Sequence, residues 1–209
     1  MSPEIPPTGA GERSPRSRIL SSAAELFYWQ GINATGVAEV SARAGVSKRT
    51  LYQIFPSKDA LVAAYLRTAD GAPLGNEAAL SRPDLSGREQ LLALFDRPVL
   101  EGRYRGCPFH NAAVELTAPE SPAWPVILEH KHRFLRRVIA AARRAGAGDP
   151  DDLGGQIAVL FEGAMALSTS LNSTEPFDFA RGAAQALTDL SAARRSGRSD
   201  LAGTMPDRE

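Results

Sequence analysis

Apolar residues recur every three or four positions along most of the chain, which is the spacing of helices with one buried face. The first such helix is predicted to begin at Ser14 and Pro15, because serine caps free amides and proline suits the first helical position. It is predicted to stop near Gly31. Its buried positions are expected to be Ile19, Ala23, Leu26 and Phe27.

Two short helices joined by a tight turn follow the first one. Thr35 is the expected N-cap of the earlier helix, Gly45 supplies a left-handed residue that ends it, and Ser47 is the expected N-cap of the later helix. A compact helix, turn and helix is the layout of a helix-turn-helix that recognises DNA. The apolar positions are Val37, Val40 and Ala44 in one helix and Leu51, Ile54 and Phe55 in the other.

The outer face of the later helix carries side chains suited to DNA. At about 100° per residue, Arg49 and Gln53 point away from the apolar side. Lys48 and Tyr52 lie on the flank of that face. Arginine pairs with guanine, glutamine pairs with adenine, and lysine and tyrosine hold phosphates. The alternative is a solvated helix face with ordinary charges, but the turn, the caps and the helix that follows favour DNA recognition.

The stretch from about Arg16 to Leu66 resembles the N-terminal domain of TetR-type transcriptional regulators. The segment AGVSKRTLYQIFPSKDAL, from Ala44 to Leu61, carries most of the match. Ile54 departs from the family pattern, in which an aromatic residue or histidine is common. Earlier matching positions are Leu26, Phe27, Gly31 and Thr35.

This resemblance implies an all-α fold of about nine helices. A three-helix DNA-binding head with a helix-turn-helix would precede a larger helical domain for ligand binding and dimerisation. The resemblance implies contacts to bases or to nearby backbone from Lys48, Arg49, Thr50 and Gln53. It implies phosphate contacts from Thr35, Ser47, Tyr52 and Lys58.

Breaks in the helical pattern divide the chain into four parts. These are a disordered arm at 1–13, the DNA-binding head at 14–62, the ligand-binding and dimerisation domain at 63–194, and a flexible tail at 195–209. Ser57 is expected to cap a fourth helix that joins head and body. No strand is expected. After a flexible break at 71–77, helices are expected at about 87–97, up to about 116, and at 121–146, 149–173 and 176–193.

Charge is segregated along the chain, although the formal net charge of its 209 residues is zero. Between Arg16 and Lys58 there are six cations and two anions, so this part carries about +4 and the remainder about −4. Such segregation is expected when one end of a protein meets phosphates. The overall 43% hydrophobic and 23% charged fractions are ordinary for a globular chain.

A cytoplasmic location is expected from two further features. No apolar run is long enough to cross a bilayer, and the N-terminus lacks a signal-peptide core. Cys107, the single cysteine, cannot form an internal disulfide, which fits a reducing compartment. Between a buried apolar role and an oxidation sensor, the flanking Pro108 and Phe109 favour the buried role.

Motifs for catalysis or metal binding are not evident. Glu129 and His132 have the Glu-x-x-His spacing of a di-iron ligand pair, but the sequence holds no second such pair. Zinc-finger spacing, a phosphate-binding glycine loop and a Ser-His-Asp motif are missing too. The chain is therefore not expected to be an enzyme or to hold a cofactor or a metal.

The middle of the chain is expected to bind a small molecule. The helices between about Tyr65 and Met165 combine apolar and aromatic residues with a few polar ones, a mixture typical of ligand pockets. The segment GCPFHNAAVE, from Gly106 to Glu115, also resembles the start of the C-terminal domain in the LmrA/YxaF-like subgroup. Packing or capping is the more common role of any one such residue. The candidates are His110, Asn111, Glu115, His130, Phe134, Phe161, Glu162 and Met165, with Asn111 and Glu115 the preferred polar pair.

The last two predicted helices are candidates for self-association. Between Ile157 and Leu171 apolar residues occupy nearly every side, and the final helix is rich in small residues. Two such helices from each of two copies can form a four-helix interface, which the resemblance also implies. The alternative is an intramolecular core. A two-fold dimer favours recognition of a palindromic site, because one helix contacts only a few base pairs.

The resulting hypothesis is a homodimeric repressor that binds palindromic double-stranded operator DNA and is released by a small, largely apolar effector. An activator of the same architecture is the nearer alternative. The alternative from another class is a helical enzyme or small-molecule carrier whose head does not bind DNA. Specific, salt-sensitive DNA binding separates the regulators from that last class.

Overall fold

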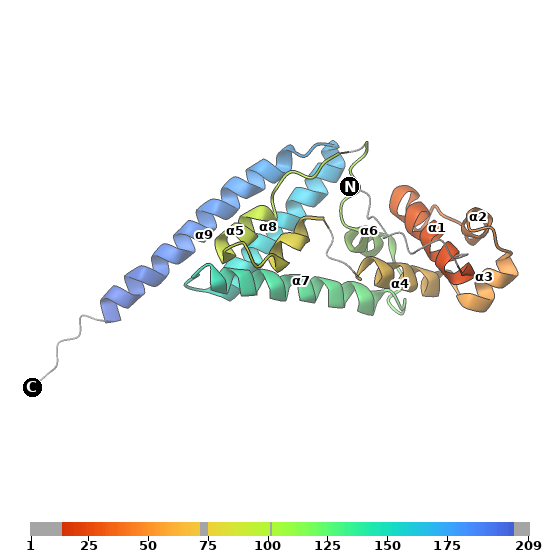
Figure 1. Cartoon of the computed structure of the whole chain (residues 1–209), viewed down its shortest axis with the longest axis horizontal. Helices are drawn as coiled ribbons and strands as arrows, with labels where there is room; N and C mark the ends of the chain where they lie inside the picture. Colours follow the sequence, from red (N-terminus) through yellow and green to blue (C-terminus); the bar gives the residue numbers. More distant parts are fainter. Residues whose placement is uncertain (1–13, 72–74, 101, 203–209) are drawn as a thin grey trace, which may run out of the picture. The chain divides into compact units, whose positions relative to one another are not determined.

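The computed structural model describes residues 14–71, 75–100 and 102–202, and every regular element in these ranges is a helix (Figure 1). The all-α prediction is therefore confirmed. The predicted disordered arm at 1–13 lies outside the described residues. Within the described ranges, none of the helices combines the length and the apolar character that crossing a bilayer requires.

Four helices begin the chain, and serine caps start three of them. They are α1 (Pro15–Gln30), α2 (Val37–Arg43), α3 (Lys48–Ile54) and α4 (Lys58–Ala69). The hydroxyls of Ser14, Ser47 and Ser57 each accept a hydrogen bond from the amide three residues ahead, as predicted. The exception is α2, whose N-cap is Gly36 and not Thr35.

Apolar side chains from these helices form a common core. The predicted positions on α1, which are Ile19, Ala23, Leu26 and Phe27, are all buried. Val40 of α2 and Leu51 of α3 have no exposed surface. The ring of Phe27 meets that of Tyr65 edge to face, with centroids 5.7 Å apart. Burying one large side chain of this kind stabilises a fold by about 1.5–3 kcal/mol, so this core contributes to holding the helices of the helix-turn-helix together.

The chain forms two compact units. The first contains α1 to α4 together with residues 105–131, which include α6 (Pro108–Glu115) and the beginning of α7 (Trp124–Arg144). The second contains 75–104 and the chain from residue 132 onward. The unit that holds the helix-turn-helix therefore extends beyond the predicted boundary at residue 62.

The second unit contains η1 (Gly75–Ser81), α5 (Gly87–Ala93), the rest of α7, α8 (Pro150–Leu171) and α9 (Glu175–Ala202). Helices α8 and α9 pack on one another. Phe161 lies at the centre of an aromatic cluster, with centroid distances of 6.0 Å to Phe95, 5.4 Å to Phe134 and 6.3 Å to Phe177. A Cβ on Gly154 would lie 2.5 Å from Ile139 Cγ1, so the missing side chain lets α8 approach α7 closely.

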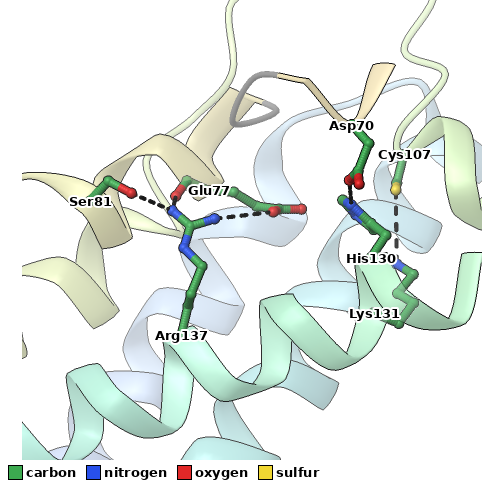
Figure 2. Close-up of polar contacts among 7 residues, drawn as sticks. All are labelled: Asp70, Glu77, Ser81, Cys107, His130, Lys131 and Arg137. Atoms are coloured by element: carbon green, nitrogen blue, oxygen red, sulfur yellow. Dashed lines mark hydrogen bonds and ion pairs between the residues drawn. The ribbon is translucent and has the colours of Figure 1, made fainter. Parts of the chain in front are cut away.

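Two elements of the second unit differ from the sequence prediction. Residues 75–77, predicted to be part of a flexible break, belong to the 3-10 helix η1. Arg137 holds this helix, because its Nη2 donates to the carbonyl of Glu77 at 2.9 Å and to Ser81 Oγ at 2.8 Å (Figure 2). Helix α9 continues to Ala202, past the predicted end at Ala193 and through 195–202 of the predicted tail. That extension contains no proline, and its Gly197 weakens a helix by only about 1 kcal/mol.

Candidate nucleic-acid interface

Helix α3 separates a buried side from an exposed side, as the sequence predicts. Leu51 is completely buried, and Phe55, which ends the helix, is buried too. Ile54 is only half-buried. The exposed residues are Lys48, Arg49, Tyr52 and Gln53. With 48% of its surface exposed, Tyr52 is available to a large partner.

The turn between α2 and α3 is held by backbone hydrogen bonds. Gly45 has a φ of +64°, a left-handed conformation that glycine adopts without strain. Its amide donates to the carbonyl of Ala42 at 3.1 Å, and the amide of Val46 donates to the carbonyl of Ser41 at 3.0 Å. These bonds set the direction in which the chain enters α3 relative to α2, and therefore the way the exposed face of α3 is turned relative to α2.

Two cationic side chains of α1 and α2 are engaged within the unit. Arg16 lies over the ring of Phe55, with its guanidinium carbon 5.4 Å from the ring centroid. Arg43 forms an ion pair with Glu25. Both arginines are exposed, so a phosphate could still reach them from the solvent side.

Thr35 differs from its predicted role. It has no exposed surface, and its hydroxyl donates to the carbonyl of Gly31 at 2.7 Å. It does not cap α2, and in this conformation it cannot contact a phosphate. Its side chain instead holds the α1–α2 turn closed, because it satisfies a buried carbonyl that no helix bond reaches.

Of the other predicted phosphate contacts, Tyr52 lies within α3, and Ser47 and Lys58 lie at helix starts. Ser47 Oγ accepts from the amide of Thr50 at 3.0 Å and lies 2.9 Å from Thr50 Oγ1, so these two hydroxyls already bond one another. Lys58 is the first residue of α4 and is half-buried. Helix starts favour anions, because their free amides carry partial positive charge.

Four of the predicted effector contacts lie in the first unit. His110 is exposed on α6. The side-chain amide of Asn111 donates to the carbonyl of Arg105 at 2.8 Å, and the Glu115 carboxylate accepts from the amide of Asn33 at 2.7 Å. His130 is buried, with its Nδ1 2.9 Å from Asp70 Oδ1 (Figure 2).

His130 and Cys107 both lie in the packed interior of the first unit. The His130 imidazole stacks on the ring of Phe109, with centroids 3.6 Å apart and planes 5° from parallel. Cys107 is buried, as predicted, and its Sγ lies 3.8 Å from Nζ of Lys131 (Figure 2).

The remaining candidates lie in the second unit. Phe134, Phe161 and Met165 are buried, and Glu162 is half-buried. The two phenylalanines touch directly in the aromatic cluster. Among the described residues, no group of three or more His, Cys, Asp or Glu side chains is arranged to hold a metal.

Sequence reasoning did not find the residues that join α1 to the 105–115 segment. The Tyr28 hydroxyl donates to the carbonyl of Gly106 at 3.1 Å, and Arg105 Nε donates to the carbonyl of Tyr28 at 2.9 Å. Asn33 makes two bonds to Glu115. These partners are 77 to 82 positions apart, so no local pattern connects them.

Known proteins share both the helix-turn-helix and the whole fold. The family model for bacterial regulatory proteins of the tetR family matches residues 19–65. A TetR-family transcriptional regulator from Streptomyces coelicolor superposes with a TM-score of 0.74 at 29% identity, covering 85% of this chain and 96% of that one. A tetR-type transcriptional regulator from Streptomyces avermitilis superposes with a TM-score of 0.73 at 32% identity, covering 86% of this chain and 98% of that one.

A further relative is similar over a shorter segment. The HTH-type transcriptional activator FasR of Mycolicibacterium smegmatis is 41% identical over 91 residues. This match covers 41% of each protein, so the similarity to FasR reaches less than half of its length.

Proposed function

Because this chain belongs to the tetR family of bacterial transcriptional regulators, we propose that it binds palindromic operator DNA as a homodimer in the cytoplasm. A small, largely apolar effector changes that binding, and release of the DNA relieves repression. Members of this family are DNA-binding regulators and not enzymes, which sets the enzymatic alternative aside.

The exposed face of α3 is the observation that supports DNA binding most strongly. Its buried side fixes the helix, and Arg49, Tyr52 and Gln53 project outward. In a major groove, Arg49 pairs with guanine and Gln53 pairs with adenine, while Tyr52 holds a phosphate. Lys48 and Lys58 add cationic contacts that make the binding salt-dependent.

Exposed rows on α8 and α9 support the homodimer. Each helix leaves small or apolar residues open to solvent at helical spacing, although both helices also contribute to the core of their unit. Two copies can bury these rows in a four-helix interface. We call the two rows the α8/α9 face. It consists of Val159, Gly163, Leu167 and Leu171 on α8 and of Phe179, Ala183, Ala186 and Leu190 on α9.

The second unit offers the apolar surroundings that the effector needs. Phe134, Phe161 and Met165 supply apolar and aromatic surface, and Glu162 supplies a polar anchor. The effector contacts predicted in the first unit, which are His110, Asn111, Glu115 and His130, stay predictions from the sequence. The effector must prefer the conformation with low DNA affinity, because a ligand shifts an equilibrium only through its differential affinity.

The second candidate function is activation of transcription instead of repression. The relative FasR is named a transcriptional activator, and its matching segment is the most similar in sequence of the three proteins compared. The same DNA-binding dimer would then recruit transcription instead of blocking it. The sign of regulation depends on where the operator lies relative to the promoter.

Selection from a pool of random duplexes tests the proposal. The wild-type protein is expected to enrich a two-fold symmetric sequence, with half-sites about 10 base pairs apart centre to centre. Failure to enrich any sequence would contradict DNA recognition. Enrichment of a single, unsymmetric half-site would retain DNA recognition and contradict the dimer.

A further inference from the structure

The α1–α2 turn is bound to the end of α6 by two hydrogen bonds, in both of which Asn33 donates and Glu115 accepts. The amide of Asn33 donates to Glu115 Oε2 at 2.7 Å, and the Asn33 side-chain amide donates to the carbonyl of Glu115 at 2.9 Å. The first bond has an ionised acceptor, which makes it stronger than an ordinary amide bond. We infer that Asn33 and Glu115 are positioning residues that fix the helix-turn-helix on α6.

A second tie joins the C-terminal part of α1 to the beginning of the same segment. The Tyr28 hydroxyl donates to the carbonyl of Gly106, and Arg105 donates to the carbonyl of Tyr28. Burial raises the pKa of Tyr28 from an ordinary value already above neutral pH to about 12, and the protonated hydroxyl can act as the donor. Both ends of the 105–115 segment are thus tied to the C-terminal end of α1 and the turn that follows it.

Gly31 makes room for the Glu115 carboxylate. Its φ is +101°, a conformation that residues with side chains rarely adopt. A Cβ at this position would lie 3.1 Å from both carboxylate oxygens of Glu115. Glycine at position 31 therefore suits both the backbone conformation of the turn and the space that the Glu115 carboxylate occupies.

The segment that carries Glu115 is continuous in sequence with the second unit on both sides. Residues 105–131 belong to the first unit, but the chain enters them from the second unit at residue 104 and returns to it at residue 132. Within the first unit, the pair of Asn33 and Glu115 ties this segment to the turn before α2.

This inference rests on the proposed function, because the property that the pair sets is the affinity of α3 for DNA. With the pair intact, the helix-turn-helix has one orientation on α6, and operator binding requires no further ordering. Without it, the turn samples other orientations, and the ordering must be achieved on binding. The affinity for a selected operator is then expected to fall about tenfold, which is a common size for such a coupling.

The test compares Glu115→Ala with wild type and with Glu120→Ala, in which an exposed carboxylate of the same unit is removed. The Glu115→Gln variant retains an acceptor for the Asn33 amide and is expected to recover most of the affinity. Titrations use the wild-type-selected duplex at a temperature where circular dichroism shows every variant fully helical. Under that condition, a residue that only stabilises the fold leaves DNA affinity unchanged.

Amide hydrogen exchange over residues 31–36 provides a readout that does not involve DNA. Glu115→Ala is expected to speed exchange of the Asn33 amide by about tenfold or more, and Glu120→Ala is expected to leave it unchanged. Unchanged exchange in Glu115→Ala would show that the pair does not hold the turn. Faster exchange with unchanged DNA affinity would overturn the positioning role and leave the proposed function standing. If the wild type binds no duplex selectively, the proposed function fails, and the DNA-positioning role fails with it.

Discussion

For single residues of the helix-turn-helix, the sequence predicts burial well but does not predict every side-chain contact. Helical periodicity placed Leu51 and Phe55 inward and Arg49 outward, and the structure confirms this. Helical periodicity did not predict the hydrogen-bond partner of Thr35. A threonine before a helix suits a cap, a phosphate contact and a buried hydroxyl equally well, and only the fold shows that its partner is the carbonyl of Gly31.

The burial of Thr35 predicts a loss of stability when its hydroxyl is removed. Thr35→Val keeps the shape and leaves the buried Gly31 carbonyl without its donor, which costs about 1–3 kcal/mol. Chemical denaturation measures the free energy of unfolding. Thr117→Val, at an exposed position, is the control. An unchanged stability combined with weaker DNA binding would restore the phosphate contact that the sequence suggested.

The helices themselves were largely predictable, because their starts are local. Serine caps at Ser14, Ser47 and Ser57 and the glycine at Gly45 mark helix ends by chemistry within a few residues. The 3-10 helix η1 was not predictable in this way. It depends on Arg137, about 60 positions away, which binds the carbonyl of Glu77.

Close packing of α8 on α7 predicts that a methyl group at Gly154 destabilises the protein. Gly154→Ala would place Cβ 2.5 Å from Ile139 Cγ1 and 2.9 Å from Ile139 Cα. Relief of this overlap requires the helices to separate, so the free energy of unfolding is expected to fall by about 1–3 kcal/mol.

The adjacent glycine supplies the control for this variant. Nothing lies within 4 Å of a Cβ at Gly155. Because alanine favours a helix over glycine, Gly155→Ala should leave stability unchanged or raise it by up to about 1 kcal/mol. Denaturant melts of both variants at one protein concentration compare them. Equal effects of the two substitutions would contradict close packing at Gly154.

At the scale of the whole molecule, the sequence predicts surfaces better than contacts. The small and apolar rows of the last two helices were visible in the sequence, although whether they form a core or an interface was left open. In the structure each of the two helices has buried and exposed apolar residues, so the core of the unit accounts for only part of these rows. The bonds between Asn33 and Glu115 could not be predicted, because one sequence carries no signal for a pair 82 positions apart.

The α8/α9 face predicts that one charge will separate the proposed dimer. The Phe179 side chain is 68% exposed in a single chain, and burial of a glutamate in its place has no compensating partner on this face. Phe179→Glu is expected to sediment as a monomer at micromolar concentrations where the wild type is a dimer. Leu128→Glu changes an equally apolar exposed residue outside that face and should remain dimeric. A dimeric Phe179→Glu would place the interface elsewhere.

The most direct test of the central claim is a binding cycle that pairs Arg49→Ala with base substitutions in the selected operator. If the exposed face of α3 recognises the major groove, replacing the contacted guanine weakens wild-type binding by about 1–3 kcal/mol and has no such effect on Arg49→Ala. Lys58→Gln should weaken the original and substituted duplexes equally. If every guanine substitution affects Arg49→Ala as much as the wild type, and the unsubstituted duplex binds both proteins equally, then α3 does not recognise DNA through this residue.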